Sequence, residues 1–519
     1  MSTTAITISV AKTRLHRSAA KASAIVMALA LPHHASSAEW TLAPTFAVRE
    51  SYSDNINLAA PQDARSALVS EMLPGIAITG NTPRLKLNLA YQLQKIVYQH
   101  DPDKLDQQLA ASATAVLLMD RIFIDAHSSI SQQSTSAFGP QSIDNIHITG
   151  NQSTLKATSI SPYLRYRLRG IASTTLRYTH GAVSSDNDSL SAQTDALMLD
   201  LVGDNSGRRW NWSANYNQTK NHDGVQQPVT ISNASLSLNV PLTSRLGLFA
   251  TNGYEKSDYQ ASTSVQPAGR SRSVGVSWNP SQRTSVVVSA GKRYFGNTYA
   301  VNASHRRHNS VWNIVYSEDI TTNYSQFLAQ SRSDTSALLN QLWQVSIPDP
   351  LLRQQAIDIY LGIAQLLGPG ANNVNYFSHR YFLQKQLSLS AALSSARSTL
   401  VLSLSANKNT AQTNVNVDSA LLGASQSLLE NQTRHVGGNA SWNWRMSSKN
   451  SFNVSVSHDK IKSLNTGRTD NNLALNIGMS RQFRPGVQGQ VDLRRIRHNS
   501  NEGIAYRENS LRASLNFRF

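Results

Sequence analysis

The 519-residue sequence contains no cysteine. This absence excludes disulfides, thiolate catalysis and cysteine-ligated metal centres, and it leaves no residue for a lipobox lipid anchor. A chain without thiols suits export into an oxidising compartment, where a free thiol would be a liability.

Long apolar runs are also missing: after the N-terminal segment, the chain contains no stretch of about 18 apolar residues. The sequence therefore predicts no transmembrane helix. The mean hydropathy of −0.33 does not exclude a membrane location, because a strand that crosses a membrane needs an apolar residue only at every second position.

Catalytic signatures are absent as well. The sequence has no nucleophile elbow, no His-Glu-x-x-His motif, no phosphate-binding loop and no paired-carboxylate motif. His127 alternates with Asp125, and the other histidines are scattered. We therefore expect no enzyme, no cofactor and no metal site, with an outer-membrane hydrolase as a minor alternative.

Acidic residues are few, 31 against 48 basic ones. Residues 1–38 carry four of the basic residues and no acidic one, so 44 basic and 31 acidic residues remain beyond them. This balance in a soluble protein would suggest nucleic acid. Here the charges are spread through alternating segments in a chain predicted to be exported, so we expect no nucleic-acid partner.

Residues 1–38 are typical of a secretory signal peptide. Four basic residues precede a short apolar run over 22–31, which is too short to span a bilayer. The small residues Ser36, Ser37 and Ala38 then form a cleavage site. We predict that the mature chain begins at Glu39, with an uncleaved anchor helix as the alternative.

Beyond residue 38, apolar and polar residues alternate in segments of about ten residues, a period of two that indicates strands with one apolar face. Leu85, Leu87 and Leu89, for example, alternate with Lys86 and Asn88. Short turns such as Arg169-Gly170 alternate with longer polar stretches, located at 53–65, 134–152, 182–191, 220–229, 258–269, 298–304 and 410–431.

Alternating short and long connections are typical of outer-membrane barrels. We predict an all-β fold, a transmembrane antiparallel β-barrel of roughly 16–22 strands, with about 22 as the preferred count, over residues 39–519. A soluble β-sandwich and a β-helix are the weaker alternatives.

One segment, 335–370, has apolar residues at helical spacing, interrupted by Pro348 and Pro350 and ended by Gly368. We predict a helical insert in a long extracellular-side connection. It would either plug or cover the lumen, or pack as a helical hairpin on the barrel rim.

The last strand ends with Leu515, Phe517 and Phe519 on one face, and Arg512 and Arg518 on the other. The apolar face predicts lipid contact in a closed barrel. The terminal pattern also resembles the C-terminal signal that the bacterial barrel assembly machinery reads, although Ser514 stands where that signal usually has glycine. Lipid and the assembly machinery are therefore expected partners.

Strand parity predicts a set of cations on the lumen face that would attract anionic solutes or an acidic polysaccharide. The alternative is that they pair with carboxylates and merely fill a polar interior. The predicted set is Lys86, Arg165, Arg167, Arg177, Arg445, Arg494, Arg512 and Arg518.

Aromatic residues near the strand ends predict interfacial girdles, with sugar-stacking platforms as the alternative. They are Tyr163, Tyr166, Tyr178, Trp278, Tyr294, Trp312, Tyr316, Trp442 and Trp444.

Three stretches carry a family resemblance. They are Trp40-Thr41-Leu42-Ala43-Pro44 with Arg49 to Leu58, Leu73-Pro74-Gly75-Ile76, and the insert from Ser333 through Pro348-Asp349-Pro350 to Arg353. The chain resembles outer-membrane β-barrel proteins associated with the PEP-CTERM/exosortase system, which accompany exopolysaccharide gene clusters. The resemblance implies a role beside polysaccharide production or surface sorting, and it supplies no catalytic residue.

The favoured function is a porin-like outer-membrane barrel that supports exopolysaccharide export or passage of anionic solutes, with the 335–370 insert restricting the lumen. The alternative is a structural or adhesive surface barrel that binds matrix through its loops.

Overall fold

The computed structural model describes residues 39–118, 120–186, 190–204, 210–261, 267–329, 376–418, 421 and 423–519. The predicted signal peptide, 1–38, and the predicted helical insert, 335–370, lie outside the described residues. The strands are β1 (Glu39–Ser53), β2 (Ala67–Asn81), β3 (Leu85–Tyr98), β4 (Lys104–Val116), β5 (Ile122–Ser134), β6 (Gln152–Leu168), β7 (Ala172–Ser185), β8 (Ser191–Gly203), β9 (Asn211–His222), β10 (Val229–Pro241), β11 (Leu246–Ser257), β12 (Ala268–Ser281), β13 (Thr284–Arg293), β14 (Gly296–Arg307), β15 (Ser310–Thr322), β16 (Tyr381–Ser394), β17 (Ser398–Ala411), β18 (Gln432–Arg445), β19 (Asn450–Ser463), β20 (Thr469–Arg484), β21 (Val487–Ser500) and β22 (Tyr506–Arg518).

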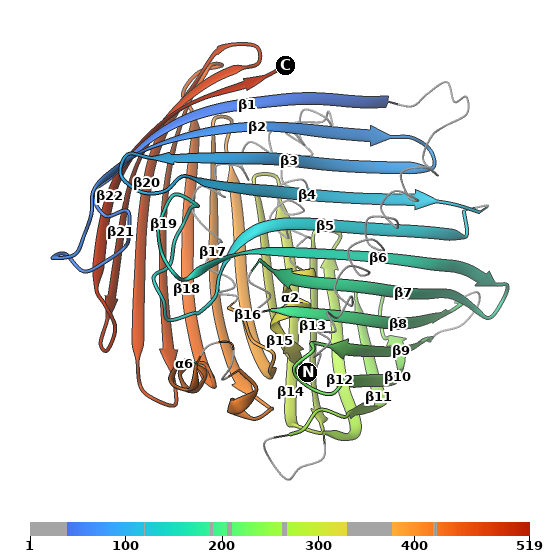
Figure 1. Cartoon of the computed structure of the whole chain (residues 1–519). Coiled ribbons are helices and arrows are strands. Elements are labelled where there is room, and N and C mark those ends of the chain that lie inside the picture. Colours follow the sequence, from blue (N-terminus) through green and yellow to red (C-terminus); the bar gives the residue numbers. More distant parts are fainter. Residues whose placement is uncertain are drawn as a thin grey trace, which may run out of the picture.

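The 22 strands form one closed antiparallel sheet, because β1 pairs with both β2 and β22. Figure 1 shows blue β1 lying next to the red C-terminal strands. In the closing pair Thr45 lies opposite Arg518, and Val48 lies opposite Leu515. Closure pairs residues 45–53 of β1 with residues 510–518 of β22, so neither strand is an open sheet edge over this length. The predicted fold class and the count of about 22 strands are confirmed.

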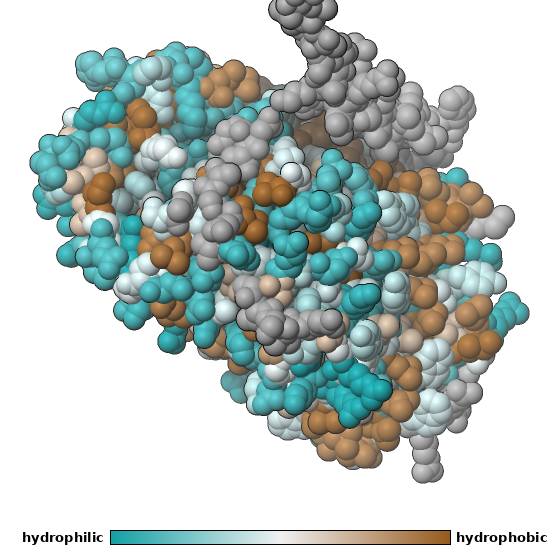
Figure 2. Space-filling model, turned by 60° about the horizontal axis from the view of Figure 1, so that its bottom comes forward, coloured by the Kyte–Doolittle hydropathy of each residue, from teal (hydrophilic) through white to brown (hydrophobic). Residues whose placement is uncertain are grey.

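The two faces of the sheet differ as the alternation predicts. Large apolar side chains such as Leu42, Leu236 and Leu493 are exposed on the outer face. The inner face buries polar side chains such as Ser51 and Asp492. Figure 2 shows brown apolar side chains gathered over the lower right of one view of the molecule, with hydrophilic ones over much of the remainder. A barrel with an apolar outer wall and a polar interior is the arrangement that a bilayer requires.

The described residues include two short helices, α2 (Asn323–Ala329) and α6 (Ala424–Leu429), and a 3-10 turn, η1 (Val415–Asp418). None of the helices in this part of the chain is long and apolar enough to cross a membrane.

Connections of different length gather at opposite ends of the barrel. We call the end of the barrel at which β1 begins and β22 ends the turn end. All odd-numbered strands begin there, and the connections at this end are short, as at 169–171 and 485–486. The longest connections, 54–66, 135–151, 258–267, 323–380 and 412–431, all lie at the other end, the loop end. The predicted insert therefore belongs to a loop-end connection, between β15 and β16.

One predicted long connection was wrong. Residues 298–304 lie inside β14, and β13 and β14 are joined by residues 294–295 alone. Tyr299 and Val301 point outward, whereas Asn302 and Ser304 are on the inner face. The small polar residues of a strand that faces the lumen resemble a loop in sequence, and this caused the error.

Hydrophobic clusters form inside the barrel where loop-end segments fold inward. Ile56 and Ile146, from two connections, pack with Val69 and Ile96 of the wall. Elsewhere α2 packs on the inner faces of β6 and β7, and its Tyr324 and Phe327 share a cluster with Leu155, Val183 and Phe377. The segments that flank 330–375 are thus anchored within the barrel.

Candidate lumen constriction

The predicted lumen cations all lie in register with the inner face, but they form two groups and not one ring. Five are solvent-exposed and lie at or near the turn end of their strands: Lys86, Arg165, Arg167, Arg445 and Arg518. None of these five forms an ion pair within the described part of the chain. The other three, Arg177, Arg494 and Arg512, pair with carboxylates. Sequence could not separate the groups, because the carboxylates come from distant segments.

The connection 135–151, which we call the inner loop, folds across the inner faces of β20, β21, β22, β1 and β3. Asp144, near its middle, accepts a hydrogen bond from Arg512 and lies 2.8 Å from the Arg494 guanidinium. Tyr98 donates to the carbonyl of Ile146 at 2.9 Å. The inner loop is therefore held to the wall by ion pairs and by a hydrogen bond to its backbone.

Ion pairs determine the charge states in this loop. Burial alone would raise the pKa of Asp144, but the charges of Arg494, His147 and Arg512 outweigh it and hold the pKa well below its usual range. Burial alone would lower the pKa of His147, but Glu508 and Asp144 raise it to about 9. At neutral pH the loop therefore presents a carboxylate and an imidazolium to the wall.

A serine, a histidine and a carboxylate meet in the inner loop, which bears on the hydrolase alternative. Ser142 Oγ lies 2.7 Å from His147 Nδ1, and His147 Nε2 lies 3.0 Å from Glu508 Oε1. His147 Nδ1 is also 3.1 Å from Asp144. The raised pKa of His147 favours the imidazolium at neutral pH, and an imidazolium donates from both nitrogens and does not accept a serine proton.

A second chain of contacts runs along the wall beside the inner loop. Asn145 donates to Gln94 at 2.8 Å, and Gln94 donates to the buried Glu71 at 2.6 Å. The Arg49 guanidinium lies 3.9 Å from Glu71. Arg49 has the same parity as the buried Ser51, so strand alternation could have found it. Asp144, His147, Asn145 and their contacts could not have been found in this way, since a loop has no periodicity.

The connection 412–431 forms a second inward-folded segment. The fully buried Arg380 donates from Nε to Asp418 at 2.7 Å, and from its terminal nitrogens to Asn431 and to the Ser427 carbonyl. Asp418 also accepts from the Ser378 hydroxyl at 2.5 Å. A buried guanidinium needs a partner for its charge and its N–H donors, because burying an unpaired charge destabilises the fold.

Glu430 joins the two inward-folded segments. Its carboxyl accepts hydrogen bonds from the Ser136 hydroxyl at 2.8 Å and from the Ala137 N–H at 3.1 Å. Burial raises the pKa of Glu430 to about 7, against the opposing effect of hydrogen bonds from Ser136 and Gln426. The contact between the segments therefore contains a carboxyl group that titrates near neutral pH.

An aromatic and cationic stack lines the inner wall towards the turn end. Phe123 and Tyr163 stack with ring centroids 4.9 Å apart, and the guanidinium of Arg177 lies 4.0 Å from the Tyr163 centroid. Arg165 lies 5.2 Å from both rings. Arg177 also pairs with Asp125 at 2.9 Å. The prediction of Tyr163 in a lipid-facing girdle was wrong, because the residue is 7% exposed and lies opposite Arg177 on the inner face.

The tryptophans of the predicted girdle lie on the outer wall. Trp278, Trp312, Trp442 and Trp444 are exposed near the turn ends of their strands. Trp442 and Trp444 stack with centroids 6.0 Å apart. This position suits the indole ring at a membrane interface.

The assembly-signal residues lie on the closing strand as alternation predicts. Leu515 and Phe519 are exposed on the outside, and Phe517 lies opposite Phe46 of β1 with ring centroids 6.3 Å apart. No cluster of three or more metal-ligating side chains occurs among the described residues.

No family model matches the chain, and no curated protein matches it. Solved structures resemble it in fold. The FrpB iron transporter from Neisseria meningitidis (F3-3 variant) is 8% identical, with 92% of this chain and 81% of that chain covered and a TM-score of 0.48. The siderophore receptor PirA from Pseudomonas aeruginosa is 9% identical, with 92% and 80% covered and a TM-score of 0.44. The outer membrane protein OpdK from Pseudomonas aeruginosa is 8% identical, with 92% and 99% covered and a TM-score of 0.35.

The chain is an outer-membrane β-barrel. Short turns are periplasmic and longer loops extracellular in such barrels, so the turn end is periplasmic and the loop end extracellular. The exposed inner cations therefore lie towards the periplasmic mouth, and the inward-folded segments enter from the extracellular side.

Proposed function

We propose that this protein is a porin-like channel for anionic solutes, in which extracellular segments folded into the lumen restrict passage. The observation that carries this proposal is the group of five exposed inner cations towards the periplasmic mouth, Lys86, Arg165, Arg167, Arg445 and Arg518. None of them forms an ion pair among the described residues, so their charge acts on the solution in the lumen.

A wall of unpaired cations raises the local concentration of anions and repels cations. The electrostatic attraction of each cation reaches about 8 Å at physiological ionic strength. A large polyanion can contact several of these cations at once, so their attractions add. Arg165 adds a guanidinium plane stacked beside Tyr163 and Phe123, a surface suited to carboxylates and to the faces of sugar rings.

In this proposal the inner loop and the connection 412–431 restrict passage through the lumen. Both are held by buried ion pairs, Asp144 with Arg494 and Arg380 with Asp418. A pathway through the barrel needs one of these segments to move or a passage beside them. We propose that the segment containing 335–370, whose flanks are anchored inside the barrel, adds to this restriction.

The resemblance to PEP-CTERM/exosortase-associated barrels supports an acidic exopolysaccharide as the anionic cargo. We propose that Leu515, Phe517 and Phe519 are read by the barrel assembly machinery during insertion. We further propose that the protein acts without catalysis, a view that the protonated state of His147 supports.

The test is the ratio of anion to cation permeability, from reversal potentials of the purified barrel in planar bilayers under a salt gradient. Charge reversal of Arg167 and Arg445 to glutamate should shift the preference from anions towards cations. The matched control is Arg481→Glu, an exposed arginine near the same end but on the outer face. Unchanged selectivity in the double variant, or an equal shift in the control, would contradict the proposal.

A sealed adhesive barrel is the second candidate, favoured by the ion pairs that hold the inward-folded segments in place inside the barrel. It predicts no conductance even after the Asp144 anchor is removed. It also predicts that shortening an exposed loop-end connection reduces binding to extracellular matrix while permeability stays unchanged.

A further inference from the structure

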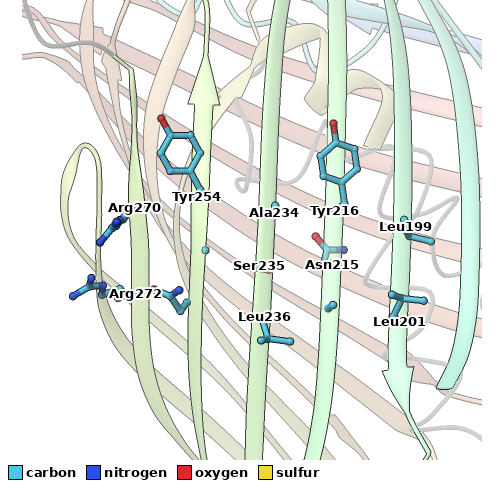
Figure 3. A pocket seen from close by; sticks show the side chains of 13 residues that line it. Leu199, Leu201, Asn215, Tyr216, Ala234, Ser235, Leu236, Tyr254, Arg270 and Arg272 are labelled. Atoms are coloured by element: carbon cyan, nitrogen blue, oxygen red, sulfur yellow. The ribbon is translucent and has the colours of Figure 1, made fainter. Parts of the chain in front are cut away.

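A hollow of about 690 Å³ lies on the outer wall and not in the lumen, across β8 to β12. Figure 3 shows it from close by, with Tyr216 and Tyr254 standing on either side of Ala234 and with Arg270 and Arg272 at one flank. We call this hollow the wall notch. Its leucine, alanine, tyrosine and arginine side chains have the parity of the outer face, so the wall notch lies outside the proposed channel.

Cross-strand register explains the shape of the wall notch. Ala234 lies directly opposite Tyr216 on one side and Tyr254 on the other, and Tyr254 lies opposite Arg270. A methyl group between two phenol rings leaves an open slot, because side chains directly opposite on one face are only about 5 Å apart. Both phenol hydroxyls point towards the extracellular end in Figure 3.

The next row towards the periplasm reverses the pattern, because its central side chain is larger than the alanine on one side of it. Leu236 lies between Ala214 and Asn252, and Asn252 lies opposite Arg272. Below this row the outer face is apolar, with Leu238 opposite Trp212 and Ala250. Leu236 therefore forms the periplasmic side of the slot, and an apolar surface suited to acyl chains lies below it.

Charge gathers along one flank of the wall notch. Arg270 and Arg272 on β12, Lys256 on β11 and Lys292 on β13 are all exposed on the outer face. None of the four forms an ion pair in the described part of the chain. The residues 262–266, which precede β12, include no acidic residue, and the nearby Asp258 carboxylate accepts a hydrogen bond from the Thr230 N–H at 2.5 Å.

The height of these cations identifies the kind of ligand. Arg270 and Arg272 are the third and fifth residues of β12 from its extracellular end, which places them roughly 7 and 14 Å along the strand from that end at about 3.4 Å per residue. An unpaired arginine at the lipid surface is costly, and its fork of donors matches phosphate oxygens. Phosphate above acyl chains is the chemistry of a phosphorylated lipid.

We propose that the wall notch binds a phosphorylated lipid of the outer leaflet. Arg270, Arg272 and Lys292 hold its phosphate, Tyr216 and Tyr254 enclose its backbone over Ala234, and its acyl chains lie on the apolar wall below.

The test is binding of diphosphorylated lipid A to the purified barrel in detergent, with the same lipid lacking phosphates as the comparison ligand. Arg270→Ala combined with Arg272→Ala should weaken binding of the phosphorylated lipid by more than about tenfold, because both charge-assisted contacts to the phosphate are lost. Native mass spectrometry of the folded barrel reports the bound lipid, and heat-dependent gel migration verifies folding.

The matched control is Lys408→Ala with Arg434→Ala. These two exposed outer-face cations lie opposite each other at a similar height on β17 and β18, away from the wall notch. This control should bind as the unmodified protein does. A second variant, Ala234→Trp, fills the slot without changing charge and should also weaken binding.

Three results would overturn the proposal: unchanged binding in the arginine double variant, an equal loss in the Lys408 and Arg434 control, or equal affinity for the dephosphorylated lipid. If the arginine double variant does not fold, Ala234→Trp decides the matter, because retention of full binding with the slot filled contradicts the proposed position.

Discussion

Replacing Asp144 by asparagine removes the charge that holds the inner loop against the wall. Asp144 contacts the guanidinium groups of Arg494 and Arg512 and the imidazole of His147. Asparagine keeps the size of the side chain but leaves two guanidinium charges without their shared carboxylate. The change therefore acts on electrostatics and leaves packing almost untouched.

The magnitude follows from the burial of the partners. Arg494 and Arg512 are each 8% exposed, and breaking a buried ion pair by removing one partner costs about 3–5 kcal/mol. Glu508 remains 3.9 Å from Arg494 and compensates in part, so the low end, about 3 kcal/mol, is the reasonable expectation. Since 1.4 kcal/mol corresponds to a factor of ten, the population with the inner loop released should rise by roughly 100-fold.

Two measurements report this release. Amide hydrogen exchange in residues 135–151 should accelerate by a similar factor, and single-channel recordings should show larger or more frequent openings. The control is Asp125→Asn, which breaks the lumenal ion pair with Arg177 at 2.9 Å without touching the inner loop. Exchange in 135–151 that stays at the unmodified rate, or that accelerates equally in the Asp125 variant, would refute the assigned anchor.

Three further predictions concern the same barrel. Because burial raises the pKa of Glu430 to about 7, its stabilising contribution is full below about 4.5 and is lost as pH rises through 7. The protection factors of the amides in 135–137, which correct for the intrinsic pH dependence of exchange, should therefore fall between pH 6 and 8, and Glu430→Gln should abolish that fall. The pKa of His147, raised to about 9, contributes stability that is full below about 6.5 and lost as pH rises through 9; alkaline pH should release the inner loop, and an acid-triggered release instead would contradict the ion pairing. Gly486 has φ of 80°, and an added Cβ would lie 2.5 Å from the Arg518 carbonyl oxygen; Gly486→Ala should lower the thermal stability of the folded barrel by about 1–3 kcal/mol, whereas Gly150→Ala, at an open position, should leave it unchanged.

Alternation alone predicted the strands and the face of most side chains. Leu85, Leu87 and Leu89 point outward, and Lys86 points inward, because successive side chains of a strand must lie on opposite faces. The same rule placed Arg494 and Arg512 in the lumen. It failed at 298–304, where lumen-facing polarity resembled a loop. At Tyr163 the girdle prediction overlooked the parity that this residue shares with Arg165, which places the ring on the inner wall.

The sequence left two roles open for the inner cations, attracting anions or pairing with carboxylates, and the structure places them in two groups. Arg177, Arg494 and Arg512 pair with carboxylates, as the structural alternative predicted, whereas Lys86 and Arg167 remain exposed. Whether an inner cation is paired or exposed depends on where the loop carboxylates lie. The path of a loop cannot be inferred from sequence, because a loop has no periodicity.

The sequence by itself determined a closed barrel, its two faces and the end at which the long connections gather, because these follow from local periodicity and from the need to satisfy every backbone hydrogen bond in a bilayer. Only the tertiary structure decided which charges meet. His147 and Glu508 are 361 residues apart in sequence and 3.0 Å apart in space, since closure brings β22 beside β1 and the inner loop then folds across both. The wall notch likewise needed the register of five strands, because a slot exists only where a small side chain lies directly opposite two large ones.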